Sequence, residues 1–432
     1  MDVTAHALET ALAELAPNTR PATDTDMVAS ERPSVVVEPA TEEEVAAVLR
    51  YANAMGLAVI PRGGGTQLTY GLPPRRADIV LSMARMNQII EYAPHDLTVT
   101  AQAGLTLAAL QRALGESRQW LALDPLVGEA ATLGGLISTN ATGARRLRYG
   151  GVRDQIIGVR VALPDGTIAR GGGKVVKNVA GYDLPKLYTG ALGTLGVILS
   201  ASFRLYPLPS FSTTALLESE RLPTLGAAVQ RILALPLTPS ALDIFPPEAP
   251  GAPYLLAARF PSGVREAVDK QARVVCGASV AQDARPRTPL DGDDDARFWE
   301  ERATRWRTRA SGENAIYVKT SVLPTDVAGW LAELEATRQE DEPPDDWQAH
   351  AGHGIIHARL AGTPAQLARR VETLRSWATE RRGSLVITDL PPSLAGALDP
   401  WGPIGALAIM RNLKERFDPN AILNPGRFVG GI

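Results

Sequence analysis

Three consecutive glycines, Gly63, Gly64 and Gly65, follow a short apolar stretch in the segment PRGGGTQL. Because glycine has no Cβ, its backbone N–H groups can surround an anion, and Arg62 adds positive charge beside them. The pattern indicates a nest for a pyrophosphate, although a bare glycine turn can also be purely structural. It matches neither the GxGxxG fingerprint, since Leu68 stands at the third glycine position, nor the Walker A loop, since no GK[ST] follows.

Two further segments are rich in glycine. Residues 131–151 (ATLGGLISTNATGARRLRYGG) pair glycines with small hydroxyl residues, and residues 174–198 end in GTLGVI at the entrance to a predicted strand. Lys177 and Lys186 in the latter segment are candidates for a phosphate contact, with solvent exposure as the other interpretation. Three glycine-rich loops between strands indicate one extended cofactor.

Three of the five histidines, His350, His353 and His357, stand within HAGHGIIH. Neutral imidazoles bind transition metals, so a metal site is one interpretation. The others are a metal-free cluster beside a cofactor, which we favour, and unrelated surface histidines. Lys319 lies in a predicted strand, AIYVKTSVL, whose alternation can aim it inward, where a lysine would anchor a carboxylate. The second half also offers the arginines Arg302, Arg305 and Arg307, for which a solvated face is the simpler interpretation.

The bulk composition limits the function classes. The 432 residues are 45% apolar and 21% charged, which suits a globular chain with more than one core. The formal charge of -3 excludes the basic surface that nucleic-acid binding needs. The single cysteine, Cys276, excludes a disulfide framework and any cysteine-ligated zinc or iron–sulfur site within this chain.

The N-terminal residues read as a short amphipathic helix, because they lack the basic region of a signal peptide. No stretch approaches the roughly 18 to 20 apolar residues that span a bilayer. We therefore expect a cytoplasmic protein that reaches a membrane only through a partner.

Local signals predict several elements. Residues 34–39 (SVVVEP) predict a strand, and Thr41 with Glu44 predicts the start of a helix that Gly56 ends. Asp165-Gly166 between alternating apolar runs predicts a hairpin. The acidic segments at 291–295 and 341–346 are predicted to be solvated loops.

The glycine density falls after residue 207, which predicts a domain boundary. Strands such as APYLLAARF then alternate with helices such as LGAAVQRILAL, a pattern typical of an α+β layer. We predict an N-terminal helix and linker (1–29), a cofactor-binding domain (30–208), an α+β domain (209–410) and a C-terminal segment that returns to the cofactor-binding domain (411–432).

Four motifs carry a resemblance to a known family. The segments PRGGGTQL, ATLGGLISTN, VKNVAGYDLPKLYTGALGTLGVI and FDPNAILNPGRF resemble the vanillyl-alcohol-oxidase type, or PCMH type, of FAD-binding fold. Within it, VKNVAGYDL is most similar to the FAD-binding E subunits of bacterial glycolate oxidases. The resemblance implies an α+β fold: an FAD-binding domain of two α/β subdomains plus an α+β cap domain on the substrate side.

The resemblance also implies which residues bind FAD. Residues 62–66 would hold the pyrophosphate, and Asn424 would return from the C-terminal segment to the flavin. Asn140 is assigned to the flavin or, alternatively, to capping a turn. Covalent relatives carry a histidine at the position of Thr66, so the resemblance implies non-covalent FAD. The full set of implied FAD-binding residues is Pro61, Arg62, Gly63, Gly64, Gly65, Thr66, Gln67, Pro125, Ala131, Thr132, Gly134, Gly135, Ser138, Thr139, Asn140, Gly143, Gly193, Thr194, Gly196, Val197, Ile198 and Asn424.

The histidine cluster departs from the family pattern. In the related 2-hydroxyacid dehydrogenases, two histidines seven positions apart supply metal ligands, and His350 and His357 match that spacing. A later glutamate-histidine-glycine segment completes those sites and supplies a base, whereas residues 383–403 here contain neither glutamate nor histidine. We therefore predict no bound metal, with His353, His357 and Lys319 as the candidate catalytic residues.

The implied function is the FAD-binding subunit of a glycolate or 2-hydroxyacid dehydrogenase complex. Its partners would be a second flavoprotein subunit and an iron–sulfur subunit, its substrate a small 2-hydroxyacid, and its place the cytoplasm or the inner membrane surface. In such a complex the chain could relay electrons or aid assembly without its own catalysis. The alternatives are a self-sufficient FAD oxidoreductase, with His353 or His357 as base, and a sugar or alditol oxidase.

Overall fold

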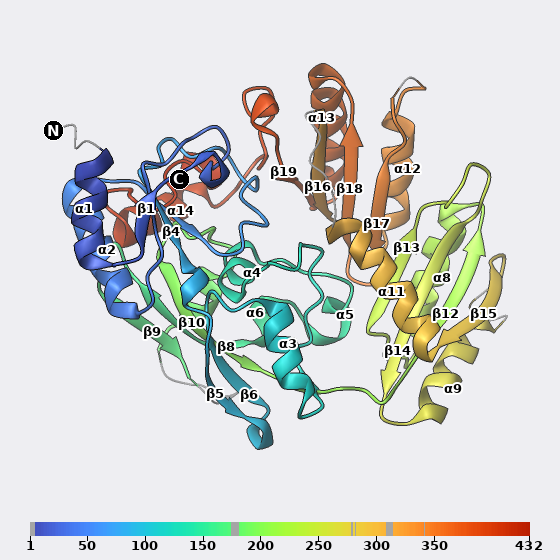
Figure 1. Ribbon diagram of the computed structural model, residues 1–432. Helices are drawn as coiled ribbons and strands as arrows, with labels where there is room; N and C mark the ends of the chain where they lie inside the picture. The colour runs from blue at the N-terminus through green and yellow to red at the C-terminus, as the bar shows by residue number, and fades with distance from the viewer. Residues whose placement is uncertain (1–4, 174–180, 278–279, 281, 308–313, 341) are drawn as a thin grey trace. The chain divides into compact units, whose positions relative to one another are not determined.

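The computed structural model describes residues 5–173, 181–277, 280, 282–307, 314–340 and 342–432 (Figure 1). Lys177 lies outside the described residues. The chain divides into two compact units, which we describe separately. Unit 1 comprises Met1–Ala141, Gly151–Leu208 and Pro403–Ile432, and unit 2 comprises Thr142–Gly150 and Pro209–Gly402. No helix among the described residues is long and apolar enough to cross a bilayer.

The first sheet of unit 1 has four strands in the order β1-β2-β4-β3, with β2, β4 and β3 parallel to one another. Helix α2 connects β2 to β3, and its apolar side packs with α1 on the sheet. The elements of this part are α1 (Ala5–Leu15), β1 (Thr19–Pro21), η1 (Asp24–Asp26), β2 (Val35–Val37), α2 (Glu42–Met55), β3 (Val59–Arg62), β4 (Ile79–Ser82) and η2 (Met83–Arg85).

Helix α2 begins and ends where the sequence predicts. The Thr41 side chain accepts a hydrogen bond from the Glu44 backbone N–H, and Gly56 ends the helix in the left-handed conformation with φ of 64°. The structure therefore confirms the predicted helix. It could be predicted because the residues that start and end it lie within one turn of its ends.

The second sheet of unit 1 is antiparallel, in the order β5-β6-β10-β8-β9. The predicted hairpin at Asp165-Gly166 joins β8 to β9 and is confirmed. The elements are β5 (Ile89–Ala93), η3 (Pro94–Asp96), β6 (Thr98–Gln102), α3 (Leu107–Gly115), β7 (Gln119–Trp120), α4 (Leu133–Thr139), α6 (Val152–Gln155), β8 (Ile156–Ala162), β9 (Ile168–Gly172), α7 (Leu184–Tyr188), β10 (Val197–Arg204), β11 (Tyr206–Pro207), α14 (Leu407–Phe417) and η5 (Val429–Gly431).

Unit 2 is built on an eight-stranded sheet in the order β15-β12-β14-β13-β17-β18-β16-β19, drawn from green to orange in Figure 1. The elements are α5 (Arg146–Tyr149), β12 (Phe211–Ser219), α8 (Leu222–Ala234), β13 (Ala241–Phe245), β14 (Tyr254–Ser262), α9 (Arg265–Cys276), β15 (Arg285–Asp291), α11 (Gly292–Arg307), β16 (Ala315–Ser321), α12 (Val327–Thr337), β17 (Asp346–His350), β18 (Ile355–Ala361), α13 (Pro364–Glu380), β19 (Ser384–Asp389) and η4 (Pro392–Leu394).

The two faces of this sheet differ in chemistry. One face packs its apolar side chains, including Val318 and Ile356, against α8, α12 and α13 in the main core of unit 2. Because side chains alternate along a strand, the neighbours Lys319 and His357 belong to the opposite face. The polar groups predicted to do chemistry therefore share that second face.

The prediction that the acidic segments are solvated loops is wrong. Residues 292–295 open helix α11, and Asp295 is buried and bonded to Arg259 at 2.6 Å. In the second segment, Asp345 pairs with the buried Arg370 at 2.5 Å. Each arginine comes from a distant part of the chain, so the acidic segments alone gave no sign of a buried partner.

Candidate functional site

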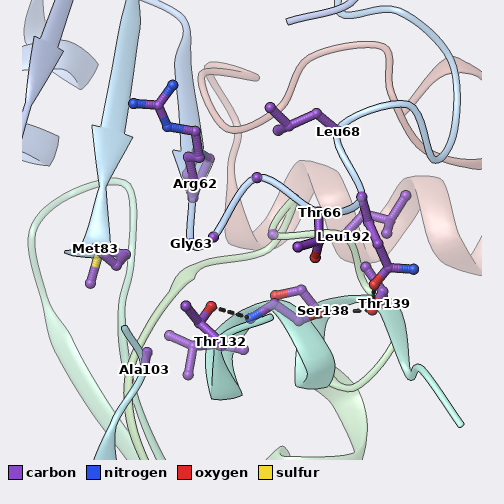
Figure 2. Close-up of a pocket in the computed structure, with 18 of the residues that line it drawn as sticks. Arg62, Gly63, Thr66, Leu68, Met83, Ala103, Thr132, Ser138, Thr139 and Leu192 are labelled. Atoms are coloured by element: carbon purple, nitrogen blue, oxygen red, sulfur yellow. Dashed lines mark hydrogen bonds between the residues drawn. The ribbon is translucent and has the colours of Figure 1, made fainter. Parts of the chain in front are cut away.

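A pocket in unit 1 gathers the glycine-rich loops (Figure 2). Strand β3 delivers the loop 63–68, α4 supplies a second wall, and residues 192–193 with the C-terminal segment supply a third. The described residues that line the pocket are Pro61, Arg62, Gly63, Gly64, Gly65, Thr66, Gln67, Leu68, Tyr70, Met83, Ala103, Thr132, Gly134, Gly135, Ser138, Thr139, Leu192, Gly193, Val197, Ile198, Asn424 and Arg427.

The glycines of the first loop are required by close backbone approach. A Cβ at Gly64 would lie 1.7 Å from the carbonyl oxygen of Ala130, and one at Gly63 would lie 2.0 Å from Thr132 Oγ1. The clash at Gly64 is with backbone and cannot be relieved without moving the chain, whereas the clash at Gly63 would displace the Thr132 side chain that caps α4. The loop therefore presents bare backbone to the pocket, as a pyrophosphate cradle requires.

Helix α4 is tied to that loop by its hydroxyl side chains. Thr132 Oγ1 accepts from the Gly135 N–H at 3.3 Å and caps the start of the helix. Thr139 Oγ1 lies 2.7 Å from Gln67 Oε1 and 2.8 Å from the Gly135 carbonyl oxygen. Figure 2 shows Thr132, Ser138 and Thr139 along the side of α4 that meets the loop.

Asn140 ends α4 in the left-handed conformation with φ of 50°, so it does cap the helix. Its Oδ1 atom is nevertheless buried without a hydrogen-bond partner among the described residues, and so is Oδ1 of Asn424. A buried acceptor without a donor is costly, and a ligand N–H or O–H would satisfy it. Asn424 lines the pocket, so its orphaned acceptor and the glycine loop fit a large polar cofactor such as FAD. Asn140 is not among the described residues of the pocket lining, and its role at FAD remains a prediction.

The C-terminal segment closes the pocket through hydrogen bonds. Asn424 Nδ2 donates to the Leu192 carbonyl oxygen at 2.6 Å, and the Asn424 N–H donates to Val59. Arg427 Nη2 donates to the carbonyl oxygens of Leu68 and Tyr70 at 2.5 and 3.0 Å. Burial lowers the pKa of Arg427 to about 10. These contacts link the segment to both the glycine loop and the loop before β10.

A buried lysine holds this segment in place. Lys414 Nζ on α14 donates to Asp418 Oδ2 at 2.6 Å, to the Leu423 carbonyl oxygen at 2.8 Å and to the Thr194 carbonyl oxygen at 2.9 Å. Asp418 also accepts from the backbone N–H groups of Ile422 and Leu423. All three protons of the ammonium group are used. The ion pair thus connects α14, the segment before Asn424 and a loop of the pocket.

The side chain of Arg62 is turned away from the glycine loop. Its guanidinium donates to Asp26 Oδ1 at 3.0 Å, and Arg20 makes two further bonds to the same carboxylate. Figure 2 shows the Arg62 side chain directed away from Thr132 and Ser138. In this arrangement the pocket offers backbone rather than guanidinium at the loop.

Asp26 links pH to the stability of unit 1. Its hydrogen bonds with Arg20 outweigh burial and lower the pKa of Asp26 well below the ordinary value of 3.8. A depressed pKa contributes stability that is present above the unfolded value and is lost as pH falls through the folded value. We expect the free energy of unfolding of wild type to exceed that of Asp26→Asn at pH 6, and the difference to shrink towards pH 2. Urea unfolding at several pH values checks this, and a constant difference would contradict it.

The structure places some implied FAD-binding residues outside the pocket lining. Thr194 is buried, with its carbonyl oxygen bonded to Lys414, and a Cβ at Gly196 would lie 2.4 Å from Val161 on β8. Pro125 and Ala131 are buried in unit 1, and Gly143 belongs to unit 2. Their roles at FAD remain predictions.

Sequence reasoning missed several lining residues: Leu68, Tyr70, Met83, Ala103, Leu192 and Arg427. Arg427 follows Asn424 in the motif LNPGR, so its position beside a recognised residue was the available signal. Met83 and Ala103 follow directly after β4 and β6, and nothing in their own residue types indicated a pocket.

Unit 2 gathers the predicted catalytic residues on the polar face of its sheet. Lys319 on β16 pairs in register with His357 on β18, and His357 pairs with Gln348 on β17. The ring of His350 lies 5.3 Å from that of His353 and 5.5 Å from that of His357, measured between centroids. We call Lys319, His350, His353 and His357 the histidine–lysine cluster.

A buried carboxylate orients the cluster. His350 Nδ1 lies 2.8 Å from Asp243 Oδ2, both side chains are buried, and Gln348 Nε2 donates to the same oxygen at 2.8 Å. Such a contact fixes the tautomer and the plane of an imidazole. Asp243 was not a candidate at the level of sequence, because it lies more than 100 residues before His350.

The turn between β17 and β18 places His353. Gly354 has a φ of 74°, and its N–H donates to the His350 carbonyl oxygen at 3.0 Å. A Cβ at Gly352 would lie 2.7 Å from a methyl group of Leu147. The turn therefore packs closely against the segment Thr142–Gly150, which also belongs to unit 2.

Burial and nearby positive charge lower the pKa values of His353 and Lys319. Burial, then His350 and Arg146, lower the pKa of His353 to about 3. Burial and then Arg146 lower the pKa of Lys319 to about 8. His353 is therefore neutral at physiological pH, while Lys319 remains largely charged at pH 7.

Comparison with known proteins matches parts of the chain to family models. The model of the FAD binding domain matches residues 33–172, and that of the C-terminal domain of FAD linked oxidases matches residues 402–428. A D-2-hydroxyglutarate dehydrogenase of Xanthomonas citri pv. viticola is 29% identical over 91% of this chain and 89% of that protein. A D-lactate dehydrogenase of Anaerostipes hadrus is 29% identical over 92% and 89%.

The glycolate oxidase subunit GlcD of Bacillus subtilis is 36% identical, over 49% of this chain and 45% of that subunit. Among solved structures, an alkyldihydroxyacetonephosphate synthase covers 93% of this chain and 78% of its own, with a TM-score of 0.70 and 18% identity. That likeness confirms the predicted α+β fold class. The family matches confirm the prediction of FAD as cofactor and of an FAD-linked oxidoreductase. Residues 33–172 and 402–428 thus match the FAD binding domain and the C-terminal domain of FAD-linked oxidases.

Proposed function

We propose that the chain is an FAD-dependent dehydrogenase that oxidises a small 2-hydroxyacid to the 2-oxoacid. The observation that carries this proposal is the histidine–lysine cluster, in which a neutral histidine and a lysine share one partly buried face. Two relatives aligned along most of their length are named as dehydrogenases of 2-hydroxyacids, which supports the same substrate class.

Residues of unit 2 suit the carboxylate and the hydroxyl group of such a substrate. Lys319 would hold the carboxylate, and His353, neutral and oriented beside His350, would accept the hydroxyl proton. His357, in register with Lys319, would border the same site. Bound FAD supplies the acceptor for the hydride that leaves the substrate carbon. The step balances: the carbon loses a hydride, the oxygen loses a proton, and a C=O bond forms.

Flavin bleaching tests the function. We expect anaerobic addition of D-lactate, glycolate or D-2-hydroxyglutarate to reduce the flavin of the purified chain, and L-lactate to be slower by at least roughly tenfold. Xylitol, which lacks a carboxylate, serves as the control for the alditol alternative. Reduction by xylitol but by none of the acids would replace the proposal with an alditol oxidase.

We further propose that FAD is held without a covalent bond. Thr66 stands in the glycine loop, and the described residues that line the pocket include neither histidine nor cysteine. Acid precipitation of the purified protein should leave the yellow flavin in the supernatant. A flavin that stays with the precipitated protein would contradict this.

A second candidate is a flavin-holding subunit of a glycolate-oxidase-type complex. The similarity to GlcD favours it. Because the chain has a single cysteine, the iron–sulfur site of such a complex would lie on a separate chain. Its partners would be that subunit and a second flavoprotein, and the chain would correspond to the E subunit. Flavin reduction only after the partners are added would favour this candidate over the self-sufficient enzyme.

A further inference from the structure

Lys319 and Arg146 lie on elements that flank the histidines, and neither has a counter-ion among the described residues. Lys319 lies on β16, and Arg146 begins α5 in the segment that packs against the 350–354 turn. Arg146 acts on both Lys319 and His353, and it is the one charged group that shifts the pKa of Lys319. Within the described part of the chain, neither Lys319 nor Arg146 forms an ion pair or a side-chain hydrogen bond.

Bringing two cations together in a partly buried site is unfavourable unless an anion joins them. Elsewhere in unit 2, Arg259 and the buried Arg370 have carboxylate partners, and the partly buried Arg231 and Arg375 donate to carbonyl oxygens. Asp243, the carboxylate that orients the cluster, is occupied by His350 and Gln348. The protein therefore leaves this pair of charges for a ligand.

We propose that Lys319 and Arg146 form a binding site for a carboxylate, and that these two cations take the role that a metal ion would play at His350 and His357. An arginine offers a planar fork of donors and a lysine a point charge, so together they can hold both oxygens of one carboxylate. The carboxylate class rests on the proposed function, whereas the anion site itself rests on the two unpaired cations.

The donor set does not fit a metal ion. Within the described ranges, no three His, Cys, Asp or Glu side chains are placed to hold a metal ion. Two resident positive charges would also repel a third. The spacing of His350 and His357 therefore does not by itself make a metal site in this chain.

Oxalate is the probe for this site, because it carries carboxylates but no C–H bond that flavin chemistry could oxidise. Isothermal titration of the purified full-length protein should give saturable oxalate binding. We expect Lys319→Met and Arg146→Met each to weaken it at least roughly tenfold. Lys270→Met and Arg273→Met, which remove exposed charges from α9 in the same unit, should leave it unchanged.

A conservative variant and a metal analysis of the purified protein complete the test. Lys319→Arg keeps the charge and should retain oxalate binding within about threefold, even if Lys319→Met proves too unstable to measure. The protein should contain no stoichiometric zinc, manganese or cobalt, and EDTA should not alter oxalate binding. Stoichiometric metal that oxalate binding requires, or oxalate affinity that is unchanged in both Met variants, would overturn the proposal.

The outcomes also separate this inference from the proposed function. Oxalate binding needs no turnover, so binding that depends on Lys319 and Arg146 without flavin reduction by any 2-hydroxyacid would refute the function and leave the site intact. Flavin reduction by D-lactate with a required metal would refute the site and leave the function intact.

Discussion

Gly64→Ala is expected to weaken FAD binding strongly. The new methyl group would lie 1.7 Å from the Ala130 carbonyl oxygen, so the loop must move away from the segment before α4. Overpacking of this kind costs about 1 to 3 kcal/mol, and every 1.4 kcal/mol is tenfold in affinity. We expect FAD affinity, measured by quenching of flavin fluorescence on titration of flavin-free protein, to fall by roughly tenfold to 100-fold or more.

Gly115→Ala is the matched control for that substitution. Gly115 is the last residue of α3, and a Cβ there meets no heavy atom within 4 Å. Since alanine is a better helix former than glycine, this variant should bind FAD normally and melt at the same or a slightly higher temperature. If Gly64→Ala bound FAD as tightly as Gly115→Ala, the close approach of the loop would not be needed for the cofactor.

Lys414→Met should cause the largest loss of stability. The substitution removes the cation from Asp418 and leaves a buried carboxylate uncompensated, a loss that typically costs about 3 to 5 kcal/mol. Because Lys414 also holds the carbonyl oxygens of Thr194 and Leu423, FAD affinity should fall with it. Urea unfolding of the flavin-free protein and FAD titration measure the two effects separately.

Arg411→Met removes an exposed charge from the same helix and should change neither quantity by more than about 0.5 kcal/mol. Asp418→Asn alone should lower the free energy of unfolding. The double variant Lys414→Met with Asp418→Asn should lose less of this free energy than the sum of the two single variants, because neither buried charge is left without its partner. Full additivity would show that Lys414 and Asp418 act independently.

Signals contained within a few residues predicted the local structure of this chain. The capping residue and the final glycine of α2, the Asp165-Gly166 hairpin and the glycine loop after β3 each owe their conformation to their own backbone chemistry. The glycine-rich segments also met in one pocket. FAD was predicted from the similarity of these motifs to a known FAD-binding family, and the spacing of the glycines alone did not identify it.

Long-range pairings could not be predicted in the same way. Lys414 bonds to a carbonyl oxygen 220 positions away, and Asp243 orients a histidine 107 positions away. A lysine on a helix or an acidic residue on a strand looks the same in sequence whether it meets solvent or a buried partner. Arg62 illustrates this, since its charge was assigned to the cofactor and instead pairs with Asp26.

Unit 1 is discontinuous along the chain, and this has a consequence for its synthesis. Asn424 and Arg427, which close the pocket, follow the whole of unit 2. About 200 residues must therefore be translated after β11 before the pocket can form, which takes roughly 10 to 40 s at about 5 to 20 residues per second. Through that interval the glycine loop lacks its C-terminal wall, so cofactor loading must wait until late in, or after, translation.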